Sequence, residues 1–298
     1  LMFFKFKINN ELLGIFYMLL CQFSFATNDA LVKMIYLHYE EIYVLNQIIF
    51  IRGIFTLFFI ILFLYIKKEM DFKKIFFSTE LSIRGALEAL AALFFFIGIA
   101  MLPFAQVYIL LSMAPILLTA LGAIFLHEKV RWRRWSAVIL GFIGVVVVIN
   151  PGKLEFGYYF IFPILAAIML SIRDMYTKNF KRNYHSLQIA FMTCFVVTVI
   201  FGIFSIYKFY TFNSKDIFIL VISAFFLALG YIFSVATIKV ALVSVTSTFR
   251  YSVILWGIIY GYFLFNEIPT KNSYIGALII ITSGLIILSR QKKLGKIK

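Results

Sequence analysis

The chain of 298 residues contains little charge, few prolines and only two cysteines. Charged residues make up 14% of the sequence, about half the usual share of a globular domain, and only 13 residues are acidic. No stretch is long and polar enough to fold as a separate water-soluble domain. This excludes an attached soluble domain for catalysis or nucleotide hydrolysis.

The sequence also lacks the motifs of several chemistries. It contains no glycine-rich loop followed by lysine of the kind that holds nucleotide phosphates, and His127–Glu128 lacks the second histidine of a zinc-binding helix. No two acidic residues lie close together inside an apolar segment, as metal-dependent prenyl transfer requires. Cys21 and Cys194 have no metal or redox spacing, so we expect buried free thiols. These absences predict that the protein is not an enzyme and uses no cofactor and no metal.

Apolar residues, by contrast, are abundant. They make up 63% of the chain, and phenylalanine alone occupies 37 positions. A soluble domain of this size could not bury so many apolar side chains and keep a wettable surface. A membrane-spanning helix needs about 20 apolar residues. We therefore predict an all-α polytopic membrane protein with ten transmembrane helices, at 12–36, 44–66, 81–100, 103–126, 134–150, 157–178, 186–207, 216–238, 242–265 and 273–289.

Basic residues are distributed unevenly over the loops between these segments. If the N-terminus is cytoplasmic, the cytoplasmic loops and ends hold 20 Lys and Arg residues and the outer loops hold four. This bias predicts that both termini lie in the cytoplasm. The same loops can meet anionic headgroups, so the net charge of +15 indicates membrane lipids as partners rather than nucleic acid.

The two halves of the chain resemble each other. Two pairs of residues recur in the same order, namely Asp29–Lys33 and Asp174–Lys178, followed by Glu128–Trp135 and Glu267–Tyr274. Each half contains five predicted helices, and an odd number makes the second half enter the membrane upside down. The sequence therefore predicts two inverted five-helix repeats, at 12–150 and 157–290, which is a transporter architecture with a substrate site between the halves.

This repeat gives the two aspartates opposite positions. Asp29 lies late in a helix that runs outward, and Asp174 lies late in a helix that runs inward. We predict that Asp29 with Lys33, and Asp174 with Arg173, act as paired gates of an alternating-access carrier. The alternative is that Asp29 and Lys33, four residues apart on one helix, merely pair with each other.

Ionisable residues inside spans cost about 2.5–3.5 kcal/mol each on insertion scales and usually mark a pathway. Arg250 is the most deeply placed cation, and its guanidinium can hold a substrate carboxylate with two parallel hydrogen bonds, beside the aromatic Tyr251. The alternative is an internal ion pair between Arg250 and Glu88. Arg52 is a second candidate anchor unless Asp29 or Glu88 neutralises it.

Other candidate residues are less specific. Glu88 can face a cationic substrate group or carry a proton, or it can form a structural salt bridge. Tyr108, Tyr231, Tyr251 and Trp256 lie away from the predicted interfaces and can stack on a planar ligand, although core packing is the more common role of such residues.

Three further features concern helix packing and shape. Gly257 and Gly261 form a small-residue pair that allows close helix contact. Pro115 and Pro163 are expected to kink the fourth and sixth spans.

Taken together, these motifs resemble a known group of carriers. Glu128 with Trp135 and Gly144, and Glu267 with Tyr274 and Gly276, are similar to the drug/metabolite transporter superfamily of the EamA type over essentially the whole chain. Within it, the sequence looks most like the bacterial S-adenosylmethionine uptake transporters. The residues behind that likeness are Asn28–Asp29, Lys33, Arg84–Gly85, Arg134–Trp135, Gly141–Gly144, Arg250–Tyr251, Phe265–Glu267 and Pro269.

The resemblance implies a multi-pass carrier of the bacterial inner membrane for a small organic metabolite. S-adenosylmethionine has a carboxylate that suits Arg250 or Arg52, cations that suit Glu88, and a ring that suits Tyr108, Tyr251 or Trp256. Related members carry riboflavin, amino acids or amphiphiles, and a membrane scaffold without transport is a third alternative. Glu88 stands where this subgroup is expected to have an apolar residue. The direction of transport, the coupling ion and the choice between monomer and homodimer stay open.

Overall fold

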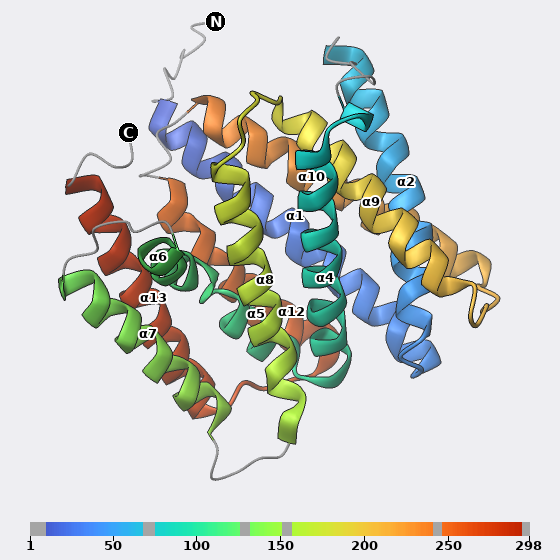
Figure 1. The fold of residues 1–298 in the computed structure, drawn as a ribbon. Helices are drawn as coiled ribbons and strands as arrows, with labels where there is room; N and C mark the ends of the chain where they lie inside the picture. Colours follow the sequence, from blue (N-terminus) through green and yellow to red (C-terminus); the bar gives the residue numbers. More distant parts are fainter. Residues whose placement is uncertain (1–9, 68–74, 126–131, 151–156, 241–245, 294–298) are drawn as a thin grey trace, which may run out of the picture.

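A computed structural model describes residues 10–67, 75–125, 132–150, 157–240 and 246–293 (Figure 1). Every secondary-structure element within these ranges is helical. The elements are α1 (Asn10–Tyr39), α2 (Val44–Lys67), α4 (Thr79–Met101), α5 (Phe104–Leu111), α6 (Ala114–Phe125), α7 (Trp132–Ile149), η1 (Gly157–Phe160), α8 (Ile161–Lys178), α9 (Ser186–Ser205), α10 (Ser214–Val240), η2 (Ser247–Tyr251), α12 (Ser252–Phe265) and α13 (Lys271–Lys293).

These elements confirm the predicted all-α polytopic fold. Among the described residues, seven helices are long and apolar enough to cross a membrane, and three shorter apolar helices at Trp135–Ile149, Phe249–Phe265 and Lys271–Ile287 bring the number to ten. Large apolar side chains such as Phe58, Phe263 and Leu278 point out of the bundle. Lipid tails are as apolar as these side chains, so their exposure costs nothing in a bilayer.

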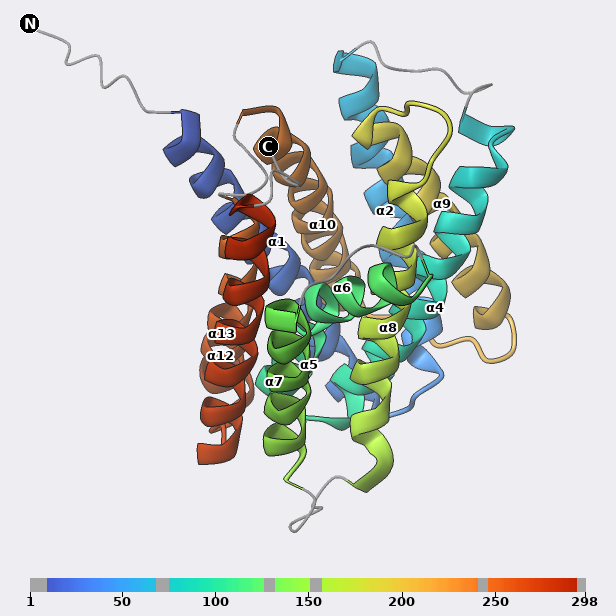
Figure 2. The same cartoon turned by 60° about the vertical axis from the view of Figure 1, so that its left-hand side comes forward.

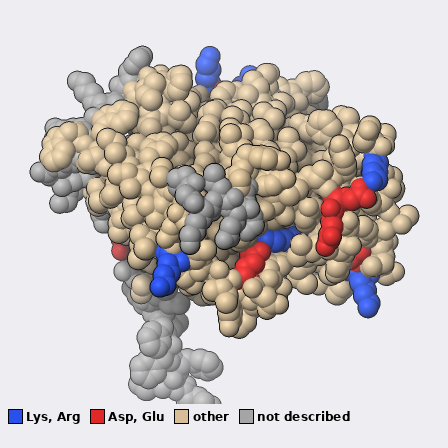
Figure 3. All heavy atoms as spheres, turned by 90° about the horizontal axis from the view of Figure 1, so that it is seen from below, with Lys and Arg blue, Asp and Glu red and all other residues tan. Residues whose placement is uncertain are grey.

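Helices form here because lipid offers the backbone no hydrogen-bond partners, so each span must satisfy its own N–H and C=O groups. Figures 1 and 2 show that α1 begins and α13 ends at one face, which also carries the α8–α9 connection. We call this the terminal face. The opposite face carries the α1–α2, α4–α5 and α9–α10 connections. Seen from this side, separate basic and acidic side chains lie among a majority of uncharged ones (Figure 3).

The contacts between helices repeat from one half of the chain to the other. α1 packs on α10 as α8 packs on α4, and α2 packs on α10 as α9 packs on α4. The contact of α1 with α12 likewise corresponds to that of α8 with α6. α2 and α9, and α7 and α13, pack on each other. This pattern is what an internal twofold repeat produces.

The α7–α13 contact shows the repeat at the level of residues. A Cβ on Gly141 would lie 3.0 Å from Ser283 Oγ, and a Cβ on Gly144 would lie 2.9 Å from Ile280 Cγ1. Gly141 and Ile280 are 139 positions apart, as are Gly144 and Ser283, and as are the repeated glutamates of the sequence. The two contacts are therefore counterparts, and α7 and α13 run antiparallel.

Three of the described spans consist of more than one helical element. The sixth begins as the 3-10 helix η1 and becomes α-helical at Ile161. The fourth span breaks after Ser112 into α5 and α6, and the ninth begins as the 3-10 helix η2 and becomes α-helical at Ser252. The interruption of the fourth span falls where Pro115 predicts it, because α5 ends at Leu111, the residue whose carbonyl a proline at position 115 cannot bond. Pro115 and Pro163 each lie in the first turn of a helix, α6 and α8 respectively, where the missing N–H has no helical partner to lose.

Candidate substrate cavity

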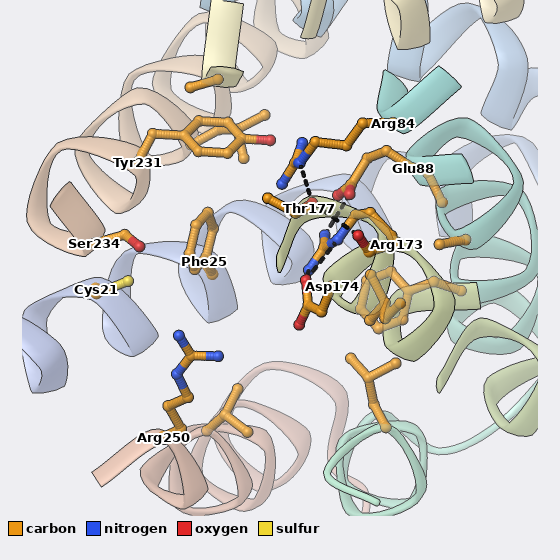
Figure 4. A pocket seen from close by; sticks show the side chains of 18 of the residues that line it. Cys21, Phe25, Arg84, Glu88, Arg173, Asp174, Thr177, Tyr231, Ser234 and Arg250 are labelled. Atoms are coloured by element: carbon orange, nitrogen blue, oxygen red, sulfur yellow. Dashed lines mark hydrogen bonds and ion pairs between the residues drawn. The ribbon is translucent and has the colours of Figure 1, made fainter. Parts of the chain in front are cut away.

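A cavity of about 1090 Å³ lies inside the bundle (Figure 4). Its lining comes from all the described spans except α7. Toward the opposite face it reaches Asp29 and Tyr108, and toward the terminal face it reaches Lys178 and Ser186, where α8 ends and α9 begins. Small-molecule sites typically enclose about 300–1,000 Å³, so this cavity is large enough for a metabolite.

Arg250 projects into this cavity from η2, at the discontinuity of the ninth span (Figure 4). Its side chain is exposed to the cavity, and no ion pair joins it to any described residue. The predicted alternative, an ion pair of Arg250 with Glu88, is wrong because Glu88 pairs with Arg173. Arg250 thus has no ion-pair partner among the described residues.

Arg173, by contrast, is held between two carboxylates. Its Nη1 contacts Glu88 Oε2, while its Nη2 lies 2.6 Å and its Nε 3.0 Å from Asp174 Oδ1. This arrangement connects α8 to α4 and neutralises the guanidinium inside the bundle. Glu88 therefore has the structural salt bridge that the sequence left as an alternative.

Asp174 keeps one oxygen free of this cluster. Among the described residues, no hydrogen bond reaches Asp174 Oδ2, and a third of the side chain is exposed. Arg250 and Arg84 are both close enough to attract this carboxylate electrostatically. Arg84 itself donates from Nε to Thr177 Oγ1 at 3.0 Å and from Nη1 to Thr193 Oγ1.

A second polar network closes the cavity toward the opposite face. Asp29 Oδ2 accepts a hydrogen bond of 2.6 Å from Tyr108, and Asp29 Oδ1 accepts one of 2.7 Å from Asn28 Nδ2. Asn28 Oδ1 in turn accepts from Arg52 Nη1 at 3.1 Å and from Ser223 Oγ at 2.8 Å. Arg52 therefore reaches Asp29 through Asn28, and these groups hold α1, α2, α5 and α10 together.

Lys33 does not pair with Asp29, although the two are four residues apart on α1. The Lys33 ammonium lies 2.6 Å from Glu267 Oε1, beyond the end of α12. The alternative of an internal Asp29–Lys33 pair is therefore wrong. Lys178, the counterpart of Lys33, lies at the end of α8 and lines the cavity, whereas Glu128 lies outside the described residues.

Two of the predicted aromatic contacts do not face the cavity. Tyr251 is buried against Gly284 of α13, and Trp256 packs between Phe23 and Tyr260, with ring centroids 4.9 Å and 6.3 Å away. Neither side chain lines the cavity. In this structure both are packing residues rather than a stacking surface for a ligand.

Tyr231 and Phe25 do line the cavity and form its aromatic wall (Figure 4). Their ring centroids lie 5.6 Å apart in an edge-to-face arrangement. A Cβ on Gly230 would lie 2.7 Å from the Phe25 ring, so only glycine lets this ring rest on α10. Tyr108 also lines the cavity, but its hydroxyl is committed to Asp29.

The model of the EamA-like transporter family matches residues 12–150 and 156–289. The chain belongs to this family.

Curated relatives of this EamA-like protein include several transporters. An S-adenosylmethionine uptake transporter of Rickettsia conorii is 26% identical over 66% of this chain and 67% of its own length. A pseudopaline exporter of Pseudomonas aeruginosa is 22% identical over 72% of this chain and 75% of its own. An uncharacterized transporter of Helicobacter pylori is 25% identical over 94% of this chain and 95% of its own.

A solved crystal structure shares the same fold. It matches 96% of this chain and 97% of its own, with a TM-score of 0.63 and 12% sequence identity. At this identity the likeness concerns the fold alone. It places the EamA-like chain among helical bundles with the same arrangement of spans.

Several cavity residues of this EamA-like protein were not singled out by the sequence analysis as site residues. Arg84 appears there only among the residues that resemble the S-adenosylmethionine uptake transporters, and Phe25 is one of 37 phenylalanines without a distinguishing pattern. Asn28 appears there beside Asp29 in the same resemblance, without a role of its own. Cys21 and Cys194 are buried free thiols, as predicted.

Proposed function

We propose that the protein is an alternating-access secondary transporter that takes up or exchanges S-adenosylmethionine across the bacterial inner membrane. One observation is the main support for this proposal. Among the described residues, the guanidinium of Arg250 has no ion-pair partner, and it shares a cavity with Asp174, whose Oδ2 accepts no hydrogen bond from them. A ligand that carries both a carboxylate and a cationic group satisfies both residues at once.

The carboxylate of the ligand is assigned to Arg250. A guanidinium binds a carboxylate through two parallel hydrogen bonds, which gives both strength and orientation. Arg173 and Arg52 are less suitable, because Arg173 is neutralised by two acidic residues and Arg52 is bound to Asn28 beside Asp29. Discontinuous helices near the middle of the membrane are the usual place for substrate groups in such transporters, and Arg250 lies at one.

The cationic groups of the ligand are assigned to Asp174 rather than to Glu88, which is already bound by Arg173. The adenine ring is assigned to the aromatic wall of Phe25 and Tyr231 on the other side of the cavity (Figure 4). Aromatic faces attract both planar rings and cations such as a sulfonium. The relatives named S-adenosylmethionine uptake transporters support this choice of substrate.

The orientation of the protein follows from the charge bias of the loops. The terminal face is assigned to the cytoplasm and the opposite face to the outside. The cavity then reaches the cytoplasmic side, so the structure corresponds to an inward-facing state. A cysteine in place of Lys271 should react with an impermeant thiol reagent outside intact cells, and one in place of Arg182 should not. The reverse result would overturn the assigned orientation.

Transport itself is tested with the purified protein in proteoliposomes and a panel of radiolabelled S-adenosylmethionine, riboflavin and amino acids. We expect saturable uptake of S-adenosylmethionine, lost in Arg250→Ala and kept in Arg182→Ala, a loop arginine outside the cavity. Preferential uptake of another member of the panel would reject the substrate. Absence of any uptake in vesicles that contain correctly folded protein would favour a scaffold.

A further inference from the structure

Lys33 and Glu267 lie just beyond the end of the cavity, on the side away from its opening. Lys33 follows Asp29 by one turn of α1, and Asp29 lines the cavity whereas Lys33 does not. Glu267 follows α12, and its backbone N–H donates a hydrogen bond of 2.8 Å to Gly261 O. The residue between Glu267 and α12 is Asn266, which has a left-handed backbone conformation with φ of 53°. The two residues come from different halves of the chain.

Their contacts join three separate segments. Lys33 Nζ lies 2.6 Å from Glu267 Oε1 and donates to Leu102 O at 3.0 Å. Glu267 Oε2 accepts the N–H of Phe104, the first residue of α5, at 2.5 Å. The ammonium also lies 4.9 Å from the centre of the Phe265 ring. The pair therefore ties α1 and α12 to the link between α4 and α5.

Close packing of α12 on α5 extends from this pair along α12. As the sequence predicted, Gly257 and Gly261 allow a close approach. A Cβ on Gly257 would lie 3.0 Å from Tyr108, and one on Gly261 would lie 3.7 Å from the backbone of Ala105. α5 therefore packs directly against α12 on the side of the cavity toward the opposite face.

Exposure differs between the charged residues at the two ends of the cavity. The side chain of Lys33 is 5% exposed and that of its partner Glu267 is 20% exposed, whereas that of Asp174, near the terminal face, is 33% exposed. Water reaches Asp174 and Arg250 but hardly reaches Lys33. The structure thus has one end open and the other closed, and the Lys33–Glu267 pair is the ionic contact at the closed end.

We infer that the Lys33–Glu267 pair is the latch of the outer gate, and that Glu267 is a gating residue which releases α12 when the carrier opens outward. This inference rests on the proposed alternating access. Outward opening must separate α12 from α1 and α5, so it must break this pair and the hydrogen bond from Phe104. Losing the latch therefore favours the outward-open population, because it weakens only the closed form.

The test measures how fast an impermeant thiol reagent, added outside intact cells, labels the cavity. Ser234→Cys serves as the reporter in a chain in which both native cysteines are replaced by serine, because Ser234 lines the cavity and differs from cysteine by one atom. Lys33→Gln and Glu267→Gln are compared singly and together. A surface pair on the outer loops, Glu41–Lys208, provides the matched control.

That control pair has similar chemistry at a different place. Glu41 pairs with Lys208 and accepts a hydrogen bond of 2.6 Å from the Tyr210 hydroxyl, and these hydrogen bonds lower the pKa of the Glu41 carboxyl. The side chains of Glu41 and Lys208 are both 47% exposed, so they do not close the cavity. Glu41→Gln should leave the labelling rate unchanged.

We expect each single gate variant to raise the labelling rate about tenfold, within the usual range of couplings between two states. The double variant should be no faster than the singles, because both changes remove the same interaction. Unchanged rates, or a double variant about a hundredfold faster, would overturn the latch. If Glu267→Gln fails to fold, Gly261→Leu replaces it in the test. The leucine separates α12 from α5 without removing a charge, so it must raise the labelling rate. Labelling needs no substrate, so failure of S-adenosylmethionine uptake in the unmodified protein rejects the proposed substrate alone.

Discussion

Replacing Arg250 by alanine is expected to abolish uptake of S-adenosylmethionine while the protein still folds and inserts. Arg250 forms no ion pair with a described residue, so its removal leaves no carboxylate unpaired inside the bundle. The contact that is lost is the one between Arg250 and the carboxylate of the ligand. Removing one partner of a buried, hydrogen-bonded charge pair costs about 2–5 kcal/mol, which corresponds to roughly a 30-fold to several-thousand-fold loss of affinity.

The assay combines two measurements on the same preparations. Uptake into proteoliposomes gives KM and the maximal rate, and thermal unfolding in detergent reports stability. Arg250→Lys should be intermediate, because lysine keeps the charge but lacks the planar fork. Arg182→Ala controls for the loss of an arginine outside the cavity. Normal uptake by Arg250→Ala, at wild-type amounts of protein, would refute the role of Arg250 in binding.

Three further changes give distinct outcomes. Arg173→Ala should lower stability by about 3–5 kcal/mol, seen as a lower melting temperature, because it leaves two carboxylates without their cation; an unchanged melting temperature contradicts this. Gly230→Ala should push the Phe25 ring into the cavity and raise the KM severalfold without preventing insertion. An unchanged KM would show that the Phe25 ring takes no part in substrate binding. Asp29→Asn should increase, and Asp174→Asn decrease, the labelling of a cavity cysteine from outside, whereas a shift in the same direction for both rejects the paired gates.

The helices were predictable because they depend on composition alone. Apolar segments of about 20 residues must be helical in lipid. The Gly257–Gly261 spacing likewise predicted a close helix contact without identifying the partner, which is α5.

The partners of the charged residues could not be predicted in the same way. From the sequence alone, several cations could pair with each carboxylate inside the bundle, because the positions of the helices relative to one another were not known. The packing of α4 on α8 selects Arg173 as the partner of Glu88. The same holds for Lys33, whose partner is 234 positions away. The break after Ser112 did have a local signal, because Pro115 leaves the carbonyl of Leu111 without its helical partner. No proline marks the 3-10 start of the ninth span.

The most direct test of the central claim is a counterflow measurement with S-adenosylmethionine. Proteoliposomes are loaded with unlabelled S-adenosylmethionine and diluted into a trace of labelled compound. A carrier that exposes one site alternately to each side will accumulate label transiently above its equilibrium level, and Arg250→Ala will not. Entry of label without this overshoot would contradict alternating access, and no entry into vesicles that contain folded protein would contradict the substrate.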